Sequence, residues 1–314
     1  MWDVLEQLKA LVVPEPTTAP ATLAALLQNS CLEPTQRVDL DIGAVQLVDV
    51  AAASDFAVYV RDRIRLGNPS MVVSRVCQVL LGGKAESSFC DMFIRANDSR
   101  KQNVLMRPDN FTDDASVAGL TKLTASFEGT SLGLNPAANI VMAWHGTDAR
   151  YVENVCRAGM RAFRFTDGGY FGTGSYVALE QEYAAQYSKK SLPNDKDEYG
   201  VILFAVFMEC AYVITPGRDY LDDMPPQDPA DPKRGFSTFY SPDGQHAQAL
   251  KPRYNAHFIP VKKTGWNHCV SGNPLPKYAD FQAAVAGKDA TAHELVAGSE
   301  KQALPVAVVW LKNK

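Results

Sequence analysis

Two segments of the sequence bring together a histidine, several tyrosines and several glycines. The run "AWHGTD" places His145, one of only five histidines in 314 residues, directly before Gly146. The run "GGYFGTGSYVALEQEYAAQYS", residues 168–188, begins with four glycines in seven residues and also contains four tyrosines. Glycine lets the backbone approach a ligand closely, and tyrosine rings can stack on a flat aromatic ligand. The segments therefore indicate a site for such a ligand, although tyrosines packed at a core edge would give the same pattern.

The glycines do not form a known nucleotide fingerprint. The Gly-Thr-Gly at 172–174 is followed by Ser-Tyr-Val, where a dinucleotide-binding turn needs a third glycine. The chain also has no Gly-Lys-Ser/Thr run of the kind that cradles phosphates. These absences argue against a Rossmann domain and against a P-loop nucleotidase.

The elements that would position these segments change in type along the chain. Ser54 as a cap and apolar residues four apart predict a helix from residue 54, and "SMVVSRVCQVLLGG" predicts a second helix. After about residue 125, short apolar runs divided by turns predict strands, and a further helix begins near Leu179. The predicted strands are "NIVMAWHG", "YGVILFAVFMECAYVI", "NAHFIPV", "AHELVAG" and "PVAVVWL". Because they do not alternate regularly with long helices, the expected fold class is α+β.

Composition and segment boundaries limit the possible functions further. Residues 1–48 are expected to form an N-terminal helical extension, and residues 49–314 the main domain with polar loops at 217–244 and 262–291. A net charge of −4 argues against general nucleic-acid binding. Six scattered cysteines without a C-x-x-C pair suit a reducing compartment. With no signal peptide and no membrane-length apolar run, the expected location is intracellular, with no membrane partner.

Three motifs together resemble the catalytic domain of the poly(ADP-ribose) polymerase family. "HGT", "YFGTGSYVALEQEYAAQYS" and "HELVAGSEKQALP" occur in that family's order and spacing. Its H-Y-E signature falls on His145, Tyr176 and Glu294. Gln302, eight residues after the glutamate, matches a further family position, and "RLGNP" looks like the family's R-x-x-N-P segment. The resemblance covers roughly residues 50–314.

The resemblance implies an H-Y-E type ADP-ribosyltransferase fold with two packed, mainly antiparallel β-sheets flanked by helices. It also implies that NAD⁺ is cleaved to nicotinamide while ADP-ribose passes to a protein side chain, and the acceptor could be the chain itself. NAD⁺ would be a substrate, and no metal is expected. Glu294 would hold the 2-hydroxyl of the nicotinamide ribose and stabilise an oxocarbenium-like transition state. His145 would position the adenosine ribose as a neutral ring.

The remaining site residues also follow from the resemblance. Gly146 would offer its backbone to the carboxamide, and the rings of Tyr176 and Tyr187 would sandwich nicotinamide. Thr147 and Arg161 match positions on the adenosine side. The turn residues expected to contact the dinucleotide are Tyr170 and Gly174. Where the family usually has a serine that binds the carboxamide, this chain has Ala184, from which weaker nicotinamide binding is expected.

Two other functions stay open from the sequence. An NAD⁺ glycohydrolase would use the same residues with water as the acceptor, and an inactive module would bind NAD⁺ or a partner without chemistry. Loss of the glutamate is the simplest route to inactivity, and Glu294 is present. In the resembling family, this glutamate also permits chain elongation, so the sequence leaves single and repeated transfer open.

Overall fold

The fold is seen in a computed structural model of the chain. It describes residues 45–64, 71–81, 88–89, 91–92, 113–127, 140–160, 169–189, 193–208, 210–215, 219, 237–239, 248–263, 269–270, 273–274, 281–283, 290 and 292–314. Residues 1–44 of the helical extension expected at 1–48, the R-x-x-N-P segment, Arg161 and most of both long loops lie outside these ranges. Residues 45–48 of that extension are not helical but belong to a strand of the main sheet.

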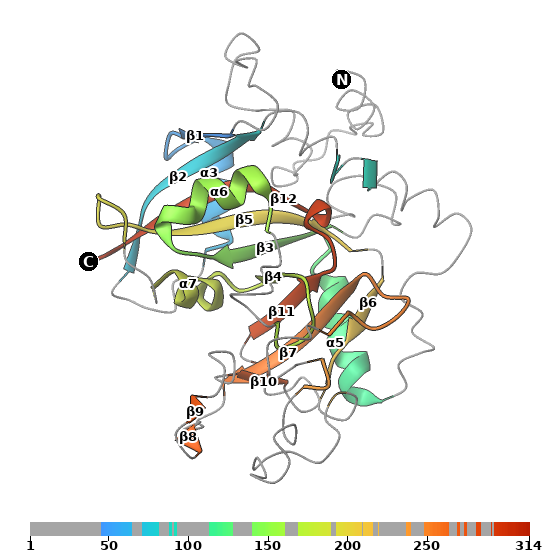
Figure 1. The fold of residues 1–314 in the computed structure, drawn as a ribbon. Coiled ribbons are helices and arrows are strands. Elements are labelled where there is room, and N and C mark those ends of the chain that lie inside the picture. Colours follow the sequence, from blue (N-terminus) through green and yellow to red (C-terminus); the bar gives the residue numbers. More distant parts are fainter. Residues whose placement is uncertain are drawn as a thin grey trace.

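Ten of the strands in the described ranges form a single sheet that runs through the molecule (Figure 1). Their order is β1-β2-β12-β5-β3-β4-β11-β7-β10, and β6 pairs with β7 at the side. Every described pairing is antiparallel except that of β6 with β7. The strands are β1 (Val45–Asp49), β2 (Met71–Leu81), β3 (Ile140–Gly146), β4 (Ser175–Ala178), β5 (Tyr199–Phe207), β6 (Ala211–Val213), β7 (Ala256–Lys263), β10 (Phe281–Ala283), β11 (Ala292–Ala297) and β12 (Ala303–Asn313), with β8 (Cys269–Val270) and β9 (Asn273–Pro274) as a separate pair.

The sheet consists of two halves that meet between β3 and β4. Strand β3 pairs with β5 through seven residues, whereas it pairs with β4 through Trp144 and Ala178 only. The sequence led us to expect two sheets, and these correspond to the two halves of one sheet. The sheet is mostly antiparallel and the fold class is α+β, both as expected. Four of the five apolar runs predicted as strands after residue 125 each contain one strand, and the run at 199–214 contains two, β5 and β6.

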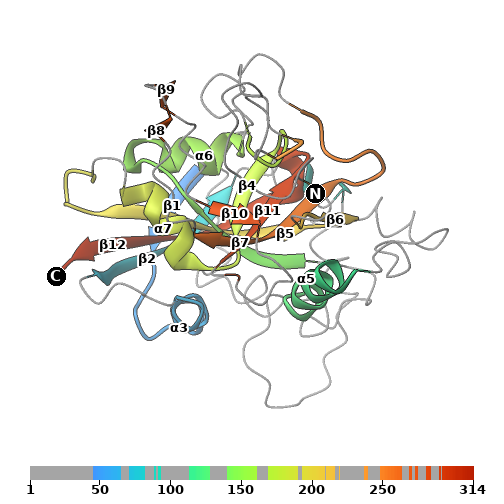
Figure 2. The same cartoon turned by 90° about the horizontal axis from the view of Figure 1, so that it is seen from below.

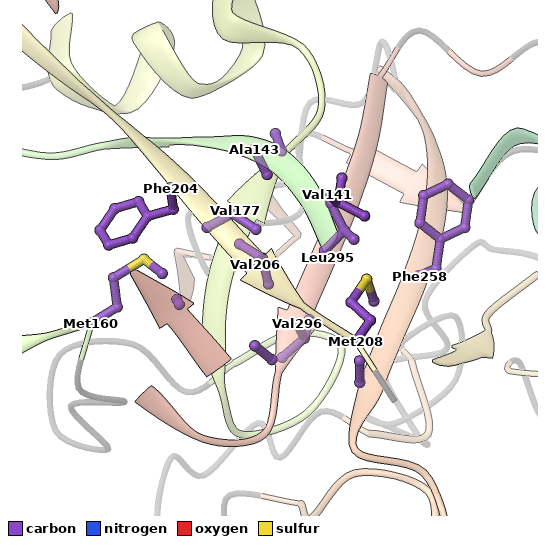
Figure 3. Close-up of a cluster of buried hydrophobic side chains, with 14 of the residues drawn as sticks. Val141, Ala143, Met160, Val177, Phe204, Val206, Met208, Phe258, Leu295 and Val296 are labelled. Atoms are coloured by element: carbon purple, nitrogen blue, oxygen red, sulfur yellow. The ribbon is translucent and has the colours of Figure 1, made fainter. Parts of the chain in front are cut away.

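Helices cover both faces of the sheet (Figure 2). One core cluster packs β3, β5 and β11 against α6 and α5, and Figure 3 shows part of it around Val141, Phe204 and Leu295. The other cluster packs the opposite face of β3 and β5 against α3 and α7. The helices are α3 (Asp55–Asp62), α5 (Asp114–Ala125), α6 (Val152–Ala158) and α7 (Gln181–Lys189), with 3₁₀ turns η3 (Ala149–Tyr151) and η5 (Glu300–Gln302).

Two predicted helix starts are confirmed, and one predicted helix is wrong. Ser54 caps α3 by accepting from the N–H of Ala57 at 3.2 Å, and α7 begins two residues after the predicted start. Residues 71–81, predicted as a helix, form β2 instead. The valines of this run fit helical spacing, but β-branched residues also favour strands. Strands β1 and β12 pair with both edges of β2, so tertiary pairing decides its conformation.

Candidate active site

The structure brings His145, Tyr176 and Glu294 onto three adjacent strands where the two halves of the sheet meet. Trp144 on β3 pairs with Ala178 on β4, and Ala178 pairs with Glu294 on β11. His145 follows Trp144 directly, and Tyr176 lies two residues before Ala178. Because neighbouring strands lie about 4.8 Å apart, residues separated by up to 149 positions in sequence (294 − 145) share one small region.

His145 is held in one orientation by the backbone of Tyr176. Its Nδ1 lies 2.8 Å from the carbonyl oxygen of Tyr176. A carbonyl only accepts, so Nδ1 carries the proton and the Nε2 of the neutral ring is an acceptor. The ring also meets Phe204 edge-on, with centroids 6.3 Å apart. In this arrangement Nε2 can accept a hydrogen bond from a hydroxyl.

The hydroxyl of Tyr176 is tied to the glycine-rich turn that precedes its strand. It donates to the carbonyl of Gly172 at 2.7 Å and accepts from the N–H of Phe171 at 2.9 Å. Gly169 (φ 63°) and Gly172 (φ 102°) adopt left-handed backbone angles, which side chains disfavour, and the N–H of Gly172 bonds Gly169 O at 3.1 Å. The glycines thus shape the turn, and the turn fixes the Tyr176 ring.

His257, which the sequence did not single out, supports this turn from the core. Its Nδ1 donates to the carbonyl of Phe171 at 2.7 Å, and its Nε2 accepts from the N–H of Lys251 at 2.9 Å. The ring is fully buried, and this burial lowers its pKa to about 4. A lone histidine between apolar residues of a strand carries no sequence signal for such a contact.

We expect His257 to make stability fall as the pH drops from about 6.5 to about 4. The folded-state pKa of about 4 lies below the unfolded value of 6.5, so the unfolded chain binds a proton first. The stabilisation is complete above pH 6.5, and its loss reaches about 3 kcal/mol, on the order of 1.4 kcal/mol per pKa unit. Urea denaturation between pH 7 and pH 4 measures it. The variant His257→Gln should be less stable at pH 7 but show a flatter profile, and an unchanged slope would contradict this origin.

Glu294 lies buried at the centre of β11 and is bonded to α7. Its side chain is 7% exposed, and its Oε1 accepts a hydrogen bond from the hydroxyl of Tyr183. The Tyr183 oxygen also lies 3.1 Å from that of Tyr187, one turn further along the helix. Burial, followed by the charge of Glu294, raises the pKa of Tyr183 well above its usual value. Tyr183 is therefore a neutral phenol that donates to the carboxylate.

The backbone beside Glu294 is fixed by the residues that lead into α7. The carboxylate of Glu180 accepts from the N–H and from Nδ1 of His293, both at 2.8 Å. The N–H of Leu179 donates to the carbonyl of His293 at 3.0 Å. The His293 ring stacks on Phe258 with centroids 5.6 Å apart. Strand β11 and the start of α7 are thus joined immediately before the carboxylate.

Gly146 and Gly174 are required by packing within the chain itself. A Cβ on Gly146 would lie 1.8 Å from the carbonyl oxygen of Ala184 on α7. A Cβ on Gly174 would lie 2.5 Å from the carbonyl oxygen of Ala297 on β11. Both approaches are far shorter than a van der Waals contact. From the sequence, we expected these glycines to contact a ligand. The structure adds a second reason for glycine at both positions, which is the close approach of neighbouring backbone.

Of the other predicted site residues, some lie beside the three strands that carry His145, Tyr176 and Glu294, and others pack in the core. Tyr187 and Thr147 are half-buried, near the carboxylate and directly after β3 respectively. Tyr170 is 4% exposed, meets Phe171 edge-on at 4.8 Å and accepts from the N–H of Ser237 at 3.3 Å, so its side chain belongs to the core. Gln302 donates to the carbonyl of Phe207 and caps its own 3₁₀ turn.

Within the described ranges, no group of three or more His, Cys, Asp or Glu side chains could hold a metal ion. None of the helices placed by the structure is long and apolar enough to cross a membrane.

The α+β sheet with its histidine, tyrosine and glutamate on neighbouring strands has the fold of the ADP-ribosyltransferases. Residues 119–227, about a third of the chain, match the family model described as the poly(ADP-ribose) polymerase catalytic domain. The matched segment contains the described site residues on β3, β4 and α7 and ends before Glu294. No curated protein matches the chain. The family match indicates ADP-ribosyl transfer chemistry, with NAD⁺ as substrate and a protein as acceptor.

Proposed function

We propose that the chain is an active NAD⁺-dependent protein ADP-ribosyltransferase. The observation that carries the proposal is Glu294: a buried carboxylate, bonded to α7, beside strands that carry His145 and Tyr176. A charge buried in this way is costly unless it is paired. A fixed carboxylate in a site of low dielectric is well suited to stabilise a positive charge that develops in a transition state.

In the proposed reaction, the bond between nicotinamide and C1′ of its ribose breaks. The electron pair leaves with nicotinamide, which becomes neutral, and positive charge develops on C1′ and the ring oxygen. Glu294 stabilises this charge and holds the ribose 2-hydroxyl. The acceptor side chain then forms a bond to C1′ and loses a proton. Because the leaving group is already cationic in NAD⁺, no general acid is needed.

The other residues bind and orient the dinucleotide in this proposal. His145 accepts from a hydroxyl of the adenosine ribose through Nε2, which its bond to Tyr176 leaves as the acceptor nitrogen. The backbone of Gly146 bonds the carboxamide, and Tyr176 and Tyr187 stack on nicotinamide. Thr147 and Arg161 contact the adenosine side. Gly174 and Tyr170 act through the shape of the turn.

Incubation with NAD⁺ labelled in the adenylate is expected to label the protein. Intact mass should rise by one ADP-ribose unit for single transfer, or by a ladder of units for elongation, which Glu294 permits. Nicotinamide release, measured in the same sample, should match the ADP-ribose bound. Release of nicotinamide and free ADP-ribose without labelled protein would identify a glycohydrolase instead. Saturable NAD⁺ binding without nicotinamide release would identify an inactive binding module.

A further inference from the structure

Tyr183 is a side chain of α7 that contacts Glu294. Its side chain is 4% exposed and that of Glu294 is 7% exposed. Tyr183 lies 111 residues from Glu294 in sequence, and its hydroxyl donates to Oε1. A buried carboxylate retains its charge only when hydrogen bonds replace the water it has lost. The Tyr183 hydroxyl supplies one such bond.

The direction of the proton in this bond follows from the chemistry of the two groups. A phenol has a single proton, and burial together with the Glu294 charge keeps it on the oxygen of Tyr183. Since that proton is donated to Glu294, the second contact, 3.1 Å between the hydroxyl oxygens, requires Tyr187 to donate to Tyr183. The two hydroxyls thus form a relay of donors that ends on the carboxylate.

The two tyrosines are also fixed with respect to each other. They lie four residues apart, on one face of α7. Their rings meet edge-on, with centroids 5.7 Å apart and planes at 71°. The ring proposed to stack on nicotinamide and the carboxylate proposed to face its ribose are therefore connected through a single helical turn.

We propose that Tyr183 is a positioning residue that holds Glu294 ionised and in the rotamer required for NAD⁺ cleavage, with Tyr187 donating to it. This inference rests on the proposed function. A glutamate side chain has several rotatable bonds, whereas the pairing of β11 fixes the backbone of Glu294. The bond to Oε1 selects one orientation before the substrate binds, so the carboxylate need not reorganise as charge develops. Tyr183 acts through Glu294 and need not contact NAD⁺.

The variant Tyr183→Phe keeps the ring and removes the donor. We expect kcat for nicotinamide release to fall tenfold to a hundredfold, the loss that corresponds to one hydrogen bond to a charged group. KM for NAD⁺ should change less than about threefold. The acid limb of the pH profile should move to higher pH, because the ionised form of Glu294 loses a stabilising bond. Tyr212→Phe, which removes a hydroxyl from another buried tyrosine, should leave kcat unchanged.

Combining the change with Glu294→Gln separates the inference from the function on which it rests. In the Glu294→Gln background, Tyr183→Phe should cause no further loss, because the bond then orients an amide that carries no charge to stabilise the ribose. If Glu294→Gln alone leaves kcat unchanged, the proposed function is wrong. If Glu294→Gln lowers kcat but Tyr183→Phe lowers it by the same factor in both backgrounds, Tyr183 acts elsewhere and the present inference is overturned.

A second variant covers the case in which Tyr183→Phe does not fold. Tyr187→Phe keeps both rings and removes only the donor behind Tyr183. It should lower kcat about twofold to fivefold, the smaller loss that corresponds to a neutral hydrogen bond, and this loss should vanish in the Glu294→Gln background. An unchanged kcat in Tyr187→Phe, or a loss that persists without the carboxylate, would overturn the relay.

Discussion

Replacing Glu294 with glutamine is expected to slow ADP-ribosyl transfer on the order of 10²–10³-fold, a barrier increase of about 3–4 kcal/mol. Glutamine has nearly the same shape, and its amide oxygen can still accept from Tyr183. What it lacks is the negative charge that opposes the positive charge on the ribose. The fold should therefore persist while the rate of nicotinamide release and of protein labelling falls.

The measurement uses initial rates of nicotinamide release at saturating NAD⁺, with thermal unfolding as a test of folding. Glu300→Gln is the matched control, because it makes the same chemical change at an exposed position six residues further along the chain. Its rate should equal that of the unaltered protein. Equal rates for Glu294→Gln and the unaltered protein would remove the basis of the proposed mechanism.

Replacing Gly146 with alanine is expected to damage both stability and NAD⁺ binding. The new Cβ would lie 1.8 Å from the carbonyl oxygen of Ala184, so β3 and α7 must separate. Overpacking of this kind costs about 1–3 kcal/mol, and more where the obstacle is backbone. Because the shift displaces the backbone proposed to bond the carboxamide, NAD⁺ affinity of the folded fraction should fall at least tenfold, or about 1.4 kcal/mol.

Urea denaturation and calorimetric titration with NAD⁺ measure the two effects separately. Gly119→Ala on α5 serves as the control, since its Cβ would approach a side-chain methyl of Val213 at 2.7 Å rather than a carbonyl. That methyl can move, and α5 packs against β6 and β7, away from α7. Gly119→Ala should therefore leave NAD⁺ affinity unchanged. A Gly146→Ala protein with ordinary stability and affinity would show that β3 and α7 tolerate separation.

The strands after residue 125 were predictable because their apolar runs are dense and bounded by turns. Strand β2 was not, because its valines satisfy helical spacing and only pairing with β1 and β12 settles its conformation. Local sequence records propensity and pattern, whereas β12, whose Ala307 pairs with Gln78 across 229 residues (307 − 78), leaves no mark in the sequence of β2. The two expected sheets are joined into one by the pairing of β3 with β4, and the local sequence of these strands does not record that pairing either.

In the candidate site, residues within local motifs could be predicted from the sequence, whereas contacts between distant segments could not. Motif order located His145, Tyr176 and Glu294, and register brings their strands together. The bond from Tyr183 to Glu294 and the support of the turn by His257 were missed, because each joins segments whose separation no local spacing records. Tyr170 was assigned to the ligand because tyrosines near glycines suit stacking, yet its side chain packs in the core.

The narrow junction between β3 and β4 gives the proposed substrate a mechanical role. His145 belongs to one half of the sheet and Glu294 to the other, and between β3 and β4 only Trp144 and Ala178 are paired. In the proposed complex, a dinucleotide bound by both residues would bridge this junction. Binding would then raise the free energy of unfolding of the domain, by about 2.7 kcal/mol when the ligand concentration is a hundred times the dissociation constant. Once ADP-ribose has been transferred to the acceptor and the product leaves, this bridge is lost, so we expect the junction to be less stable at the end of each turnover.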